Sequence, residues 1–414
     1  MASQSLSPIV QKLHDYVQKS PTEFEITILP TVTTNKMETD ELSLEESVVL
    51  VEGHLGMDAR SLPWMTAVIR KDYKSLKKSL LKASASASDE SSTSASKAAE
   101  DINALHSQIQ MATNALMLVN PDHSTAWGDR RRALIVTSGD WVREMQFLNL
   151  LMTQHSKAPS SWGHRKYVLQ QIVKTVVASQ EHEPKLVDLV RKEIALCSKI
   201  AEKFPKNYYA WTHRRYLWSF CRLPHLQSDS ETISLLDEEF DALKLWLEQH
   251  ISDHSAVHYL GQVLEMRLQH IESSSSSSSS AIATDSIQIA EKSLSLSKSL
   301  LDAHPDHESL WILRRLMVQV LFQHAQKQNS TAIRSLLESL VDDIWIKAQR
   351  EEYVTVGATS VYAWSFLVWC MSQLRLGGQA RQQRLKYGLK FLQSHSHVYS
   401  QMWKTNGEEL LLAK

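Results

Sequence analysis

Residues 205–215 read Pro-Lys-Asn-Tyr-Tyr-Ala-Trp-Thr-His-Arg-Arg, a turn-forming stretch followed by a Trp and, three residues later, an Arg. The same Trp-x-x-Arg motif recurs along the chain, each time after a polar or proline-containing turn and at intervals of about 35 to 55 residues. A motif repeated at such intervals is typical of a repeat architecture. The intact copies are Trp127 with Arg130, Trp162 with Arg165, Trp211 with Arg214, and Trp311 with Arg314.

A fifth copy, between the last two, has lost both signature residues. Residues 252–260 read Ser-Asp-His-Ser-Ala-Val-His-Tyr-Leu, with Val257 at the Trp position and Leu260 at the Arg position. The surrounding residues keep the spacing of the other copies. We therefore interpret this segment as a decayed repeat in the same register.

The segments between the motifs carry apolar side chains with the period of an amphipathic helix. One helical face ahead of Trp211 would hold Leu186, Leu189, Val190, Ile194, Cys197, Ile200, Ala201 and Phe204. Each unit is therefore predicted to be a helix, a turn with Pro, Asn or Asp, and a second helix that starts near the Trp. With only 11 Gly and 10 Pro in 414 residues, the chain is predicted to be all-α, a right-handed α-α solenoid (superhelix) of helical hairpins.

The three-residue spacing of Trp and Arg has a structural explanation in this geometry. Trp211 and Arg214 lie on the same face of the second helix, because residues three apart share a helical face. We expect the motif Trp residues to be core residues that anchor one hairpin against the next. The Arg could lie over the indole ring, or could bond the exposed carbonyls of a neighbouring helix end.

Four regions are predicted along the chain. From the N-terminus, they are an acidic arm at 1–60, a helix with a Ser- and Ala-rich linker at 61–104, the repeats at 105–320, and a C-terminal helical region at 321–414. In the arm, Val48–Val51 could form one strand or a packed extended segment. Residues 272–285 are expected to form a serine-rich loop within the repeats, because such a tract buries too little apolar surface to offset its ordering entropy.

Composition favours a cytoplasmic protein. The 45 basic and 46 acidic residues nearly cancel, so no field of one sign would attract nucleic acid or an anionic membrane. Three scattered cysteines, Cys197, Cys221 and Cys370, fit a reducing compartment. No apolar run has the length of a membrane span, and the N-terminus lacks the pattern of a signal peptide.

The motif copies resemble the protein prenyltransferase α-subunit repeat, over roughly residues 105–320. Tetratricopeptide repeats are the rival, but their period is a steadier 34 residues or so, whereas the spacing here varies. Within the family, residues 47–56, 118–127 and 252–259 are similar to the repeat-containing proteins rather than to the α subunits of farnesyltransferase or Rab geranylgeranyltransferase.

The resemblance implies an α-like subunit that is not active alone and forms a heterodimer with a β chain of the Rab geranylgeranyltransferase type. In that family the β chain holds the zinc and most of the isoprenoid pocket, so no cofactor is expected in this chain. The implied reaction is geranylgeranyl transfer to a Cys of a protein such as a SNARE, from geranylgeranyl diphosphate at a shared site. The residues themselves leave farnesyl transfer open.

Three residues are candidates for an accessory catalytic role near the diphosphate. Lys157 and Lys206 each stand five residues before a motif Trp, and Tyr208 opens the helix that carries Trp211. The resemblance maps the family's diphosphate lysine to Lys157. Cations near a helix start suit the negative charge that develops on a leaving diphosphate. The alternative is that Lys157 is a solvated turn residue and Tyr208 a packing residue.

The sequence gives less support for a metal site, a nucleotide-binding loop or a hydrolase. The pairs His254 and His258, His304 and His307, and His395 and His397 have plausible metal spacings, but no Cys or carboxylate completes a site. Gly-rich phosphate loops and Gly-x-Ser-x-Gly elbows are absent from the sequence. A second hypothesis from another class stays open, a helical-repeat scaffold that binds peptides and has no catalytic role.

Overall fold

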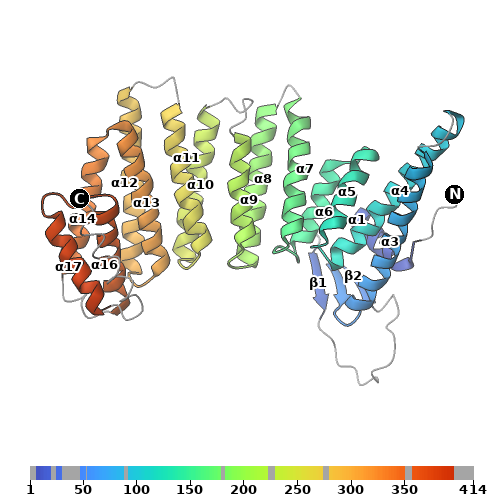
Figure 1. Ribbon diagram of the computed structural model, residues 1–414, viewed down its shortest axis with the longest axis horizontal. Coiled ribbons are helices and arrows are strands. Elements are labelled where there is room, and N and C mark those ends of the chain that lie inside the picture. The colour runs from blue at the N-terminus through green and yellow to red at the C-terminus, as the bar shows by residue number, and fades with distance from the viewer. Residues whose placement is uncertain are drawn as a thin grey trace, which may run out of the picture. The chain divides into compact units, whose positions relative to one another are not determined.

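The computed structural model describes residues 6–19, 25–29, 47–52, 54–87, 92–178, 182–221, 229–273, 279–349 and 357–395. The chain divides into two compact units, Met1–Leu217 and Trp218–Lys414. Helices form most of the described part of each unit (Figure 1). The predicted all-α class built from helical hairpins is therefore confirmed, and the right-handed sense of the superhelix stays a prediction.

Each motif lies in the first turns of a helix. The motif helices are α5 (Ser124–Val136), α7 (Pro159–Val177), α9 (Tyr208–Cys221), α11 (His254–Ser273) and α13 (Glu308–Gln328). In all of them the Trp position is the fourth residue of the helix, and this includes Val257 in α11. The register of the decayed copy is therefore confirmed.

A first helix precedes each motif helix, as predicted. These first helices are α4 (Ser92–Val119), α6 (Trp141–Met152), α8 (His182–Lys203), α10 (Asp229–Gln249) and α12 (Ser279–Ala303). The apolar face predicted for α8 is buried at Leu186, Val190, Cys197 and Ile200. Burial of this face holds α8 in place, since helix stability in proteins comes mainly from packing an apolar side.

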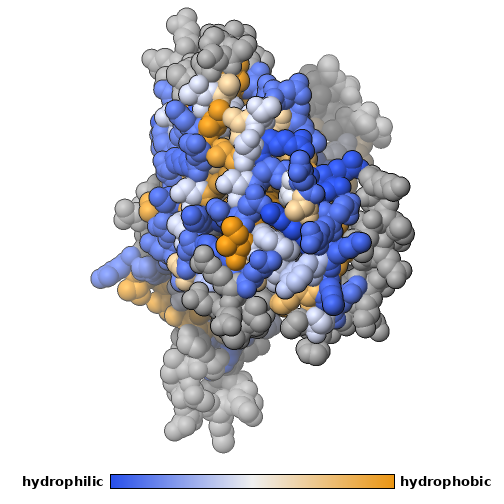
Figure 2. All heavy atoms as spheres, turned by 90° about the vertical axis from the view of Figure 1, so that its left-hand side faces the viewer, coloured by the Kyte–Doolittle hydropathy of each residue, from blue (hydrophilic) through white to orange (hydrophobic). Residues whose placement is uncertain are grey.

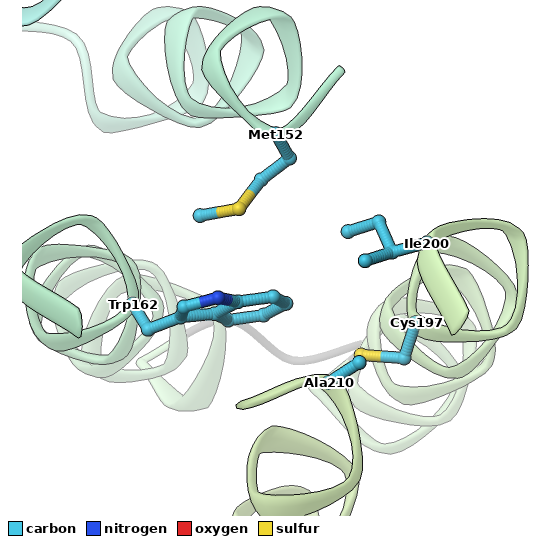
Figure 3. Close-up of a cluster of buried hydrophobic side chains, with 5 residues drawn as sticks. All are labelled: Met152, Trp162, Cys197, Ile200 and Ala210. Atoms are coloured by element: carbon cyan, nitrogen blue, oxygen red, sulfur yellow. The ribbon is translucent and has the colours of Figure 1, made fainter. Parts of the chain in front are cut away.

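The motif Trp residues are core residues, as predicted. Trp162 is 3% exposed and belongs to a buried cluster with Met152, Cys197, Ile200 and Ala210. Figure 3 shows its indole lying among side chains from neighbouring helices. The ring thus shares one buried cluster with side chains of α6, α8 and α9, which pack around it and α7.

The N-terminal arm is more ordered than the sequence indicated. It contains helix α1 (Pro8–Lys19) and strands β1 (Glu25–Leu29), β2 (Val48–Val51) and β3 (His54–Asp58). The strand order is β1-β3-β2, with β1 parallel and β2 antiparallel to β3. The strand prediction for β2 is confirmed, while α1 and the other two strands were not predicted.

The bounds predicted for the Ser- and Ala-rich linker and for the serine-rich loop differ from those of the structure. Helix α3 (Leu62–Ala87) extends into the Ser- and Ala-rich tract, and α4 already begins at Ser92, so only 88–91 lie outside the described residues. Likewise α11 ends at Ser273 and α12 begins at Ser279, which narrows the loop predicted at 272–285. Packing of α3 against α4 and of α12 against α13 explains why these weakly apolar ends are helical.

Two predicted region boundaries are also wrong. The boundary at residue 105 falls inside α4, and the boundary at residue 321 falls inside α13. Both helices run on because each packs against neighbouring helices, α4 against α3 and α5, and α13 against α11 and α12. The sequence offered no break at the true helix ends other than short polar turns.

The C-terminal part of unit 2 is helical, as predicted, with α14 (Thr331–Ala348), α16 (Gly357–Gln373) and α17 (Arg381–His395). Trp364 of α16 meets Trp345 of α14 and Phe391 of α17, with ring centroids 5.2 Å and 5.3 Å away.

The face drawn in Figure 2 is mostly hydrophilic, with apolar side chains in a broken band between polar ones. Among the described helices, none has the length and apolar character needed to cross a membrane.

Candidate functional site

Two motif turns of unit 1 lie side by side, residues 153–158 before α7 and residues 204–207 before α9. The Lys157 ammonium donates a hydrogen bond of 3.4 Å to the carbonyl oxygen of Pro205. We call these two turns, together with Tyr208 at the start of α9, the turn edge. The motif turns therefore assemble into one edge, although 48 residues separate Lys157 from Pro205.

Asn207 holds the turn edge together. Its side-chain Nδ2 donates to the carbonyl oxygen of Ser156 at 3.1 Å, and its Oδ1 accepts from the backbone N–H groups of Tyr209 and Ala210. The second set of bonds caps the N-terminus of α9. One buried side chain thus fixes both the spacing of the two turns and the start of the motif helix.

The three predicted site residues gather at this edge. Lys157 and Lys206 are exposed, and Tyr208 is 63% exposed with its ring against that of Tyr209. Lys206 adopts a left-handed backbone with φ of 59°, which turns the chain sharply into α9. Two ammonium groups and a phenol therefore lie around the start of α9, whose first backbone N–H groups are already bonded to Asn207 Oδ1 and the Lys206 carbonyl oxygen. Their role near a diphosphate stays a prediction.

The N-terminal sheet borders the turn edge. The backbone N–H of Ile26 in β1 donates to Thr153 Oγ1 at 2.9 Å, and Lys203 pairs with Glu25 at 2.9 Å. The hydrogen bond from Lys203 lowers the pKa of the Glu25 carboxyl. Strand β1 therefore touches the ends of both α6 and α8, immediately before the two turns.

A buried carboxylate joins α5 to α7. Glu144 of α6 accepts two hydrogen bonds from Arg130, at 2.7 Å and 2.6 Å, and one from His164 Nε2 at 2.7 Å. The imidazole of His164 also stacks on the indole of Trp127, with centroids 4.4 Å apart. We call these four residues the Glu144 joint, since they connect one motif helix to the next through α6.

The same arrangement joins α7 to α9. Glu193 of α8 receives two hydrogen bonds from Arg165 and one of 2.8 Å from His213 Nε2, and His213 lies against Trp162 with centroids 5.0 Å apart. We call this set the Glu193 joint. Its Arg, Glu and His are each no more than 3% exposed, so the charges are neutralised inside the protein rather than by water.

Both carboxylates stay ionised in the folded protein. Burial alone would raise the pKa of Glu193, but the adjacent Arg165 and His213 outweigh it and hold that pKa at about 2. Glu144 likewise has a pKa of about 2 beside Arg130 and His164. Burial lowers the pKa of both histidines despite their carboxylate partners. Each imidazole is therefore neutral at pH 7, with its Nε2–H donating to a carboxylate.

The joints predict that acid destabilises the fold. The unfolded chain takes up protons at His213 below its ordinary pKa of 6.5, whereas the folded chain resists, so the free energy of unfolding should fall from pH 7 to pH 5. One such proton contributes a slope of at most about 1.4 kcal/mol per pH unit. The Glu193 contribution persists to lower pH, because it is present above about pH 4.5 and is lost toward pH 2.

Urea denaturation at pH 7, 6 and 5 measures this slope. His213→Gln keeps an N–H donor for Glu193 but removes the titrating group, so its slope should be shallower than that of the wild type. His258→Gln, at an exposed position of α11, should keep the wild-type slope. Identical slopes for His213→Gln and the wild type would contradict the account of this joint.

Each motif arginine contacts a side chain of its own helix or of a neighbouring one. The predicted stacking on Trp is confirmed for Arg214, whose guanidinium carbon lies 5.0 Å from the Trp211 ring centroid. Arg130 and Arg165 bond a buried carboxylate, which was not expected, and Arg130 also donates to the Gln110 carbonyl oxygen of α4 at 3.1 Å. Arg314 bonds Ser297 on the preceding helix at 3.3 Å. A buried guanidinium takes the strongest acceptor in reach, and only the structure identifies that acceptor.

The glutamates and histidines of the joints were missed from the sequence, although a signal exists. Glu144 and Glu193 each stand 18 residues before the next motif Trp, and Glu239 stands 18 residues before Val257. The same position before Trp311 is Ser293. In the decayed copy Leu260 replaces the Arg, and in the first helix that follows it, α12, Ser293 replaces the Glu. A buried Arg–Glu pair is costly to break singly, which explains why both members are replaced.

The other clusters and cavities do not include Lys157, Lys206 or Tyr208. Among the described residues, no group of three or more His, Cys, Asp or Glu is arranged to hold a metal ion. His304 and His307 only form an edge-on ring contact, and His397 lies outside the described residues. A cavity of about 410 Å³ lies between α1, α4, α6 and α8. Its lining reaches the turn edge at Thr153 and Phe204 but includes neither Lys157 nor Tyr208.

These features define a class, an α-α repeat protein whose Trp-x-x-Arg hairpins are connected by buried Arg–Glu–His joints. The family model described as "Protein prenyltransferase alpha subunit repeat" matches residues 141–172, 190–221 and 236–267. Trp162, Trp211 and Val257 each stand 21 residues after the first residue of their match. Three hairpins of the chain therefore match the protein prenyltransferase alpha subunit repeat.

Similar proteins carry the same repeat in their names. "Protein prenyltransferase alpha subunit repeat-containing protein 1-B" of Xenopus laevis is 27% identical over 262 residues, 56% of this chain and 59% of the frog protein. The Homo sapiens protein of that type, repeat-containing protein 1, is 28% identical over 234 residues, 49% of this chain and 56% of its own length.

A more distant similarity extends to a named transferase subunit. "Geranylgeranyl transferase type-2 subunit alpha" of Saccharomyces cerevisiae is 26% identical over 163 residues, 38% of this chain and 45% of the yeast protein. In all three comparisons the chain spans less than two thirds of the relative's length. The similarity therefore supports the repeat family directly, while activity and partners need an argument from the site.

Proposed function

We propose that the chain is the α-type subunit of a cytoplasmic, heterodimeric protein prenyltransferase that transfers a geranylgeranyl group to a Cys of a protein such as a SNARE. The partner is a β chain of the Rab geranylgeranyltransferase type, which holds the zinc and most of the isoprenoid pocket. The three matches to the repeat and the similarity to a yeast geranylgeranyl transferase α subunit support this proposal.

The observation that carries the proposal is the turn edge. Lys157 reaches the turn that contains Lys206, and Tyr208 opens the adjoining helix. In the reaction the acceptor sulfur bonds to the first carbon of the isoprenoid while the carbon–oxygen bond to diphosphate breaks. Diphosphate leaves with the electron pair, so the transition state gathers negative charge that the two ammonium groups and the phenol would stabilise.

A kinetic experiment tests the role of the edge. In the complex with the β chain, Lys157→Ala should lower turnover about ten- to a hundredfold, because a donor to the leaving group acts mostly in the transition state. Binding of the β chain, measured by pull-down, should be unchanged. Lys82→Ala, at an exposed position of α3, should turn over like the wild type.

A second substitution separates catalysis from packing. Combining Lys157→Ala with Tyr208→Phe should cost less than the sum of the two single losses, since both groups would serve one anion. Wild-type turnover in the Lys157→Ala complex would instead favour the alternative function, a helical-repeat scaffold. That alternative finds support in the joints, where the Trp, Arg and His side chains all serve to pack one repeat on the next.

A further inference from the structure

The basic side chains of unit 1 concentrate on its motif helices. Helices α5, α7 and α9 together contain eight Lys and Arg but a single acidic residue, Asp129. The neighbouring first helices α6 and α8 contain six basic and five acidic residues. The whole chain is balanced, with 45 basic and 46 acidic residues. A neutral protein thus carries a local excess of positive charge on one set of helices.

Part of this charge is paired with carboxylates, and part is not. Arg130 and Arg165 belong to the buried joints, and Arg132 pairs with Asp129. Three others recur at one position, four residues after the motif Trp of α5, α7 and α9. We call these the cationic row: Arg131, Lys166 and Arg215. Within the described parts of the chain, no carboxylate forms an ion pair with a member of this row.

Tyrosines fix two members of the row in place. The guanidinium carbon of Arg131 lies 5.0 Å from the ring centroid of Tyr167, and the Lys166 ammonium lies 4.9 Å from that of Tyr216. Each tyrosine comes from the next motif helix, so the contacts step along the repeats. Burial lowers the pKa of both cations. They are therefore partly desolvated and held in one geometry rather than moving freely in water.

The row leaves positive charge that no carboxylate of the described chain pairs with. Arg131 donates from Nε to the neutral His164 at 3.1 Å, and Lys166 lies over a tyrosine ring, so both lose hydration without gaining a negative partner. An anionic partner would neutralise this charge, and the Arg131 and Lys166 side chains are already ordered for it. From this charge asymmetry we infer that the cationic row of α5, α7 and α9 is a docking surface for an acidic patch on the partner β chain.

An acidic protein surface fits better than a nucleic acid. The chain has a pI of about 7.0, so it lacks the basic field that draws polyanions from a distance. The row consists of Arg and Lys side chains beside tyrosine rings, and Arg and Tyr are enriched at protein interfaces. This inference rests on the proposed heterodimer, and it adds which face of the chain meets the partner and what charge that partner presents.

The test compares charge reversal with a matched control in binding to the β chain of Rab geranylgeranyltransferase. Lys166→Glu with Arg215→Glu should weaken binding about a hundredfold at low salt, whereas Lys82→Glu with Lys97→Glu, on α3 and α4, should bind like the wild type. Wild-type affinity should fall about tenfold between about 50 and about 300 mM NaCl, and the reversed variant should show little salt dependence. Thermal melts confirm that the variants are folded, and Lys166→Gln with Arg215→Gln should bind with intermediate affinity.

The outcomes separate this inference from the proposed function. Equal binding of the wild type and the reversed variant at both salt concentrations would overturn the inference while leaving the heterodimer in place. A wild-type chain that does not bind the β chain at all would defeat both. Wild-type binding of a 20-nucleotide RNA that is lost on reversal, with β-chain binding unchanged, would assign the row to nucleic acid and overturn the inference.

Discussion

Glu193→Ala is expected to lower the free energy of unfolding by about 3–5 kcal/mol, the usual cost of removing one partner from a buried ion pair. The carboxylate accepts two hydrogen bonds from Arg165 and one from His213, and all three groups are shielded from water. Without Glu193 the guanidinium stays buried and unpaired. Urea denaturation at pH 7 measures the loss, and Glu100→Ala, at an exposed site of α4, should stay within about 0.5 kcal/mol of the wild type.

The decayed repeat suggests a second substitution that should restore part of the lost stability. Where the Arg is replaced by Leu260, the corresponding Glu position holds Ser293, and both side chains are buried. Arg165→Leu with Glu193→Ser should therefore destabilise less than Glu193→Ser alone, because a buried charge is no longer left without a partner. Additive losses would show that Arg165 and Glu193 are not energetically coupled.

The repeat pattern could be read from the sequence because it depends on local periodicity. A Trp three residues before an Arg, a preceding turn and an apolar first helix together predicted every motif helix, including α11, where Val257 replaces the Trp. Burial of Trp127, Trp162, Trp211 and Trp311 followed from the same pattern. Each of these features is set within about one helical hairpin of the residue concerned.

The joints depend on contacts that no local pattern displays. Arg130 and Glu144 are 14 residues apart, but Arg165 and Glu193 are 28 apart, since the length between consecutive helices varies. Only the constant 18 residues from each Glu to the next motif Trp would have indicated a shared role. Lys157 was identified from its place in the motif, but its contact with Pro205 required the turns to be placed side by side.

The N-terminal sheet and the serine tracts were missed for a different reason. Parallel pairing of β1 with β3 joins Glu25 to His54 across a long connection, and pairing of that kind leaves little trace in local sequence. Serine and alanine have low apolar surface, so their tracts resemble linkers in isolation. At the ends of α3 and α4 they continue helices whose stability comes from packing further along.

The central claim is that this chain completes a prenyltransferase rather than acting alone. The measurement is incorporation of labelled geranylgeranyl into an acceptor-Cys SNARE protein by the chain alone, by the Rab geranylgeranyltransferase β chain alone, and by the two together. The chain alone should give no transfer above background, because the attacking thiolate must be activated by a metal that the β chain holds. The two chains together should transfer the geranylgeranyl group, with a fixed number of groups per acceptor protein. Transfer by this chain without a second polypeptide, or no transfer from a complex that forms, would contradict the account.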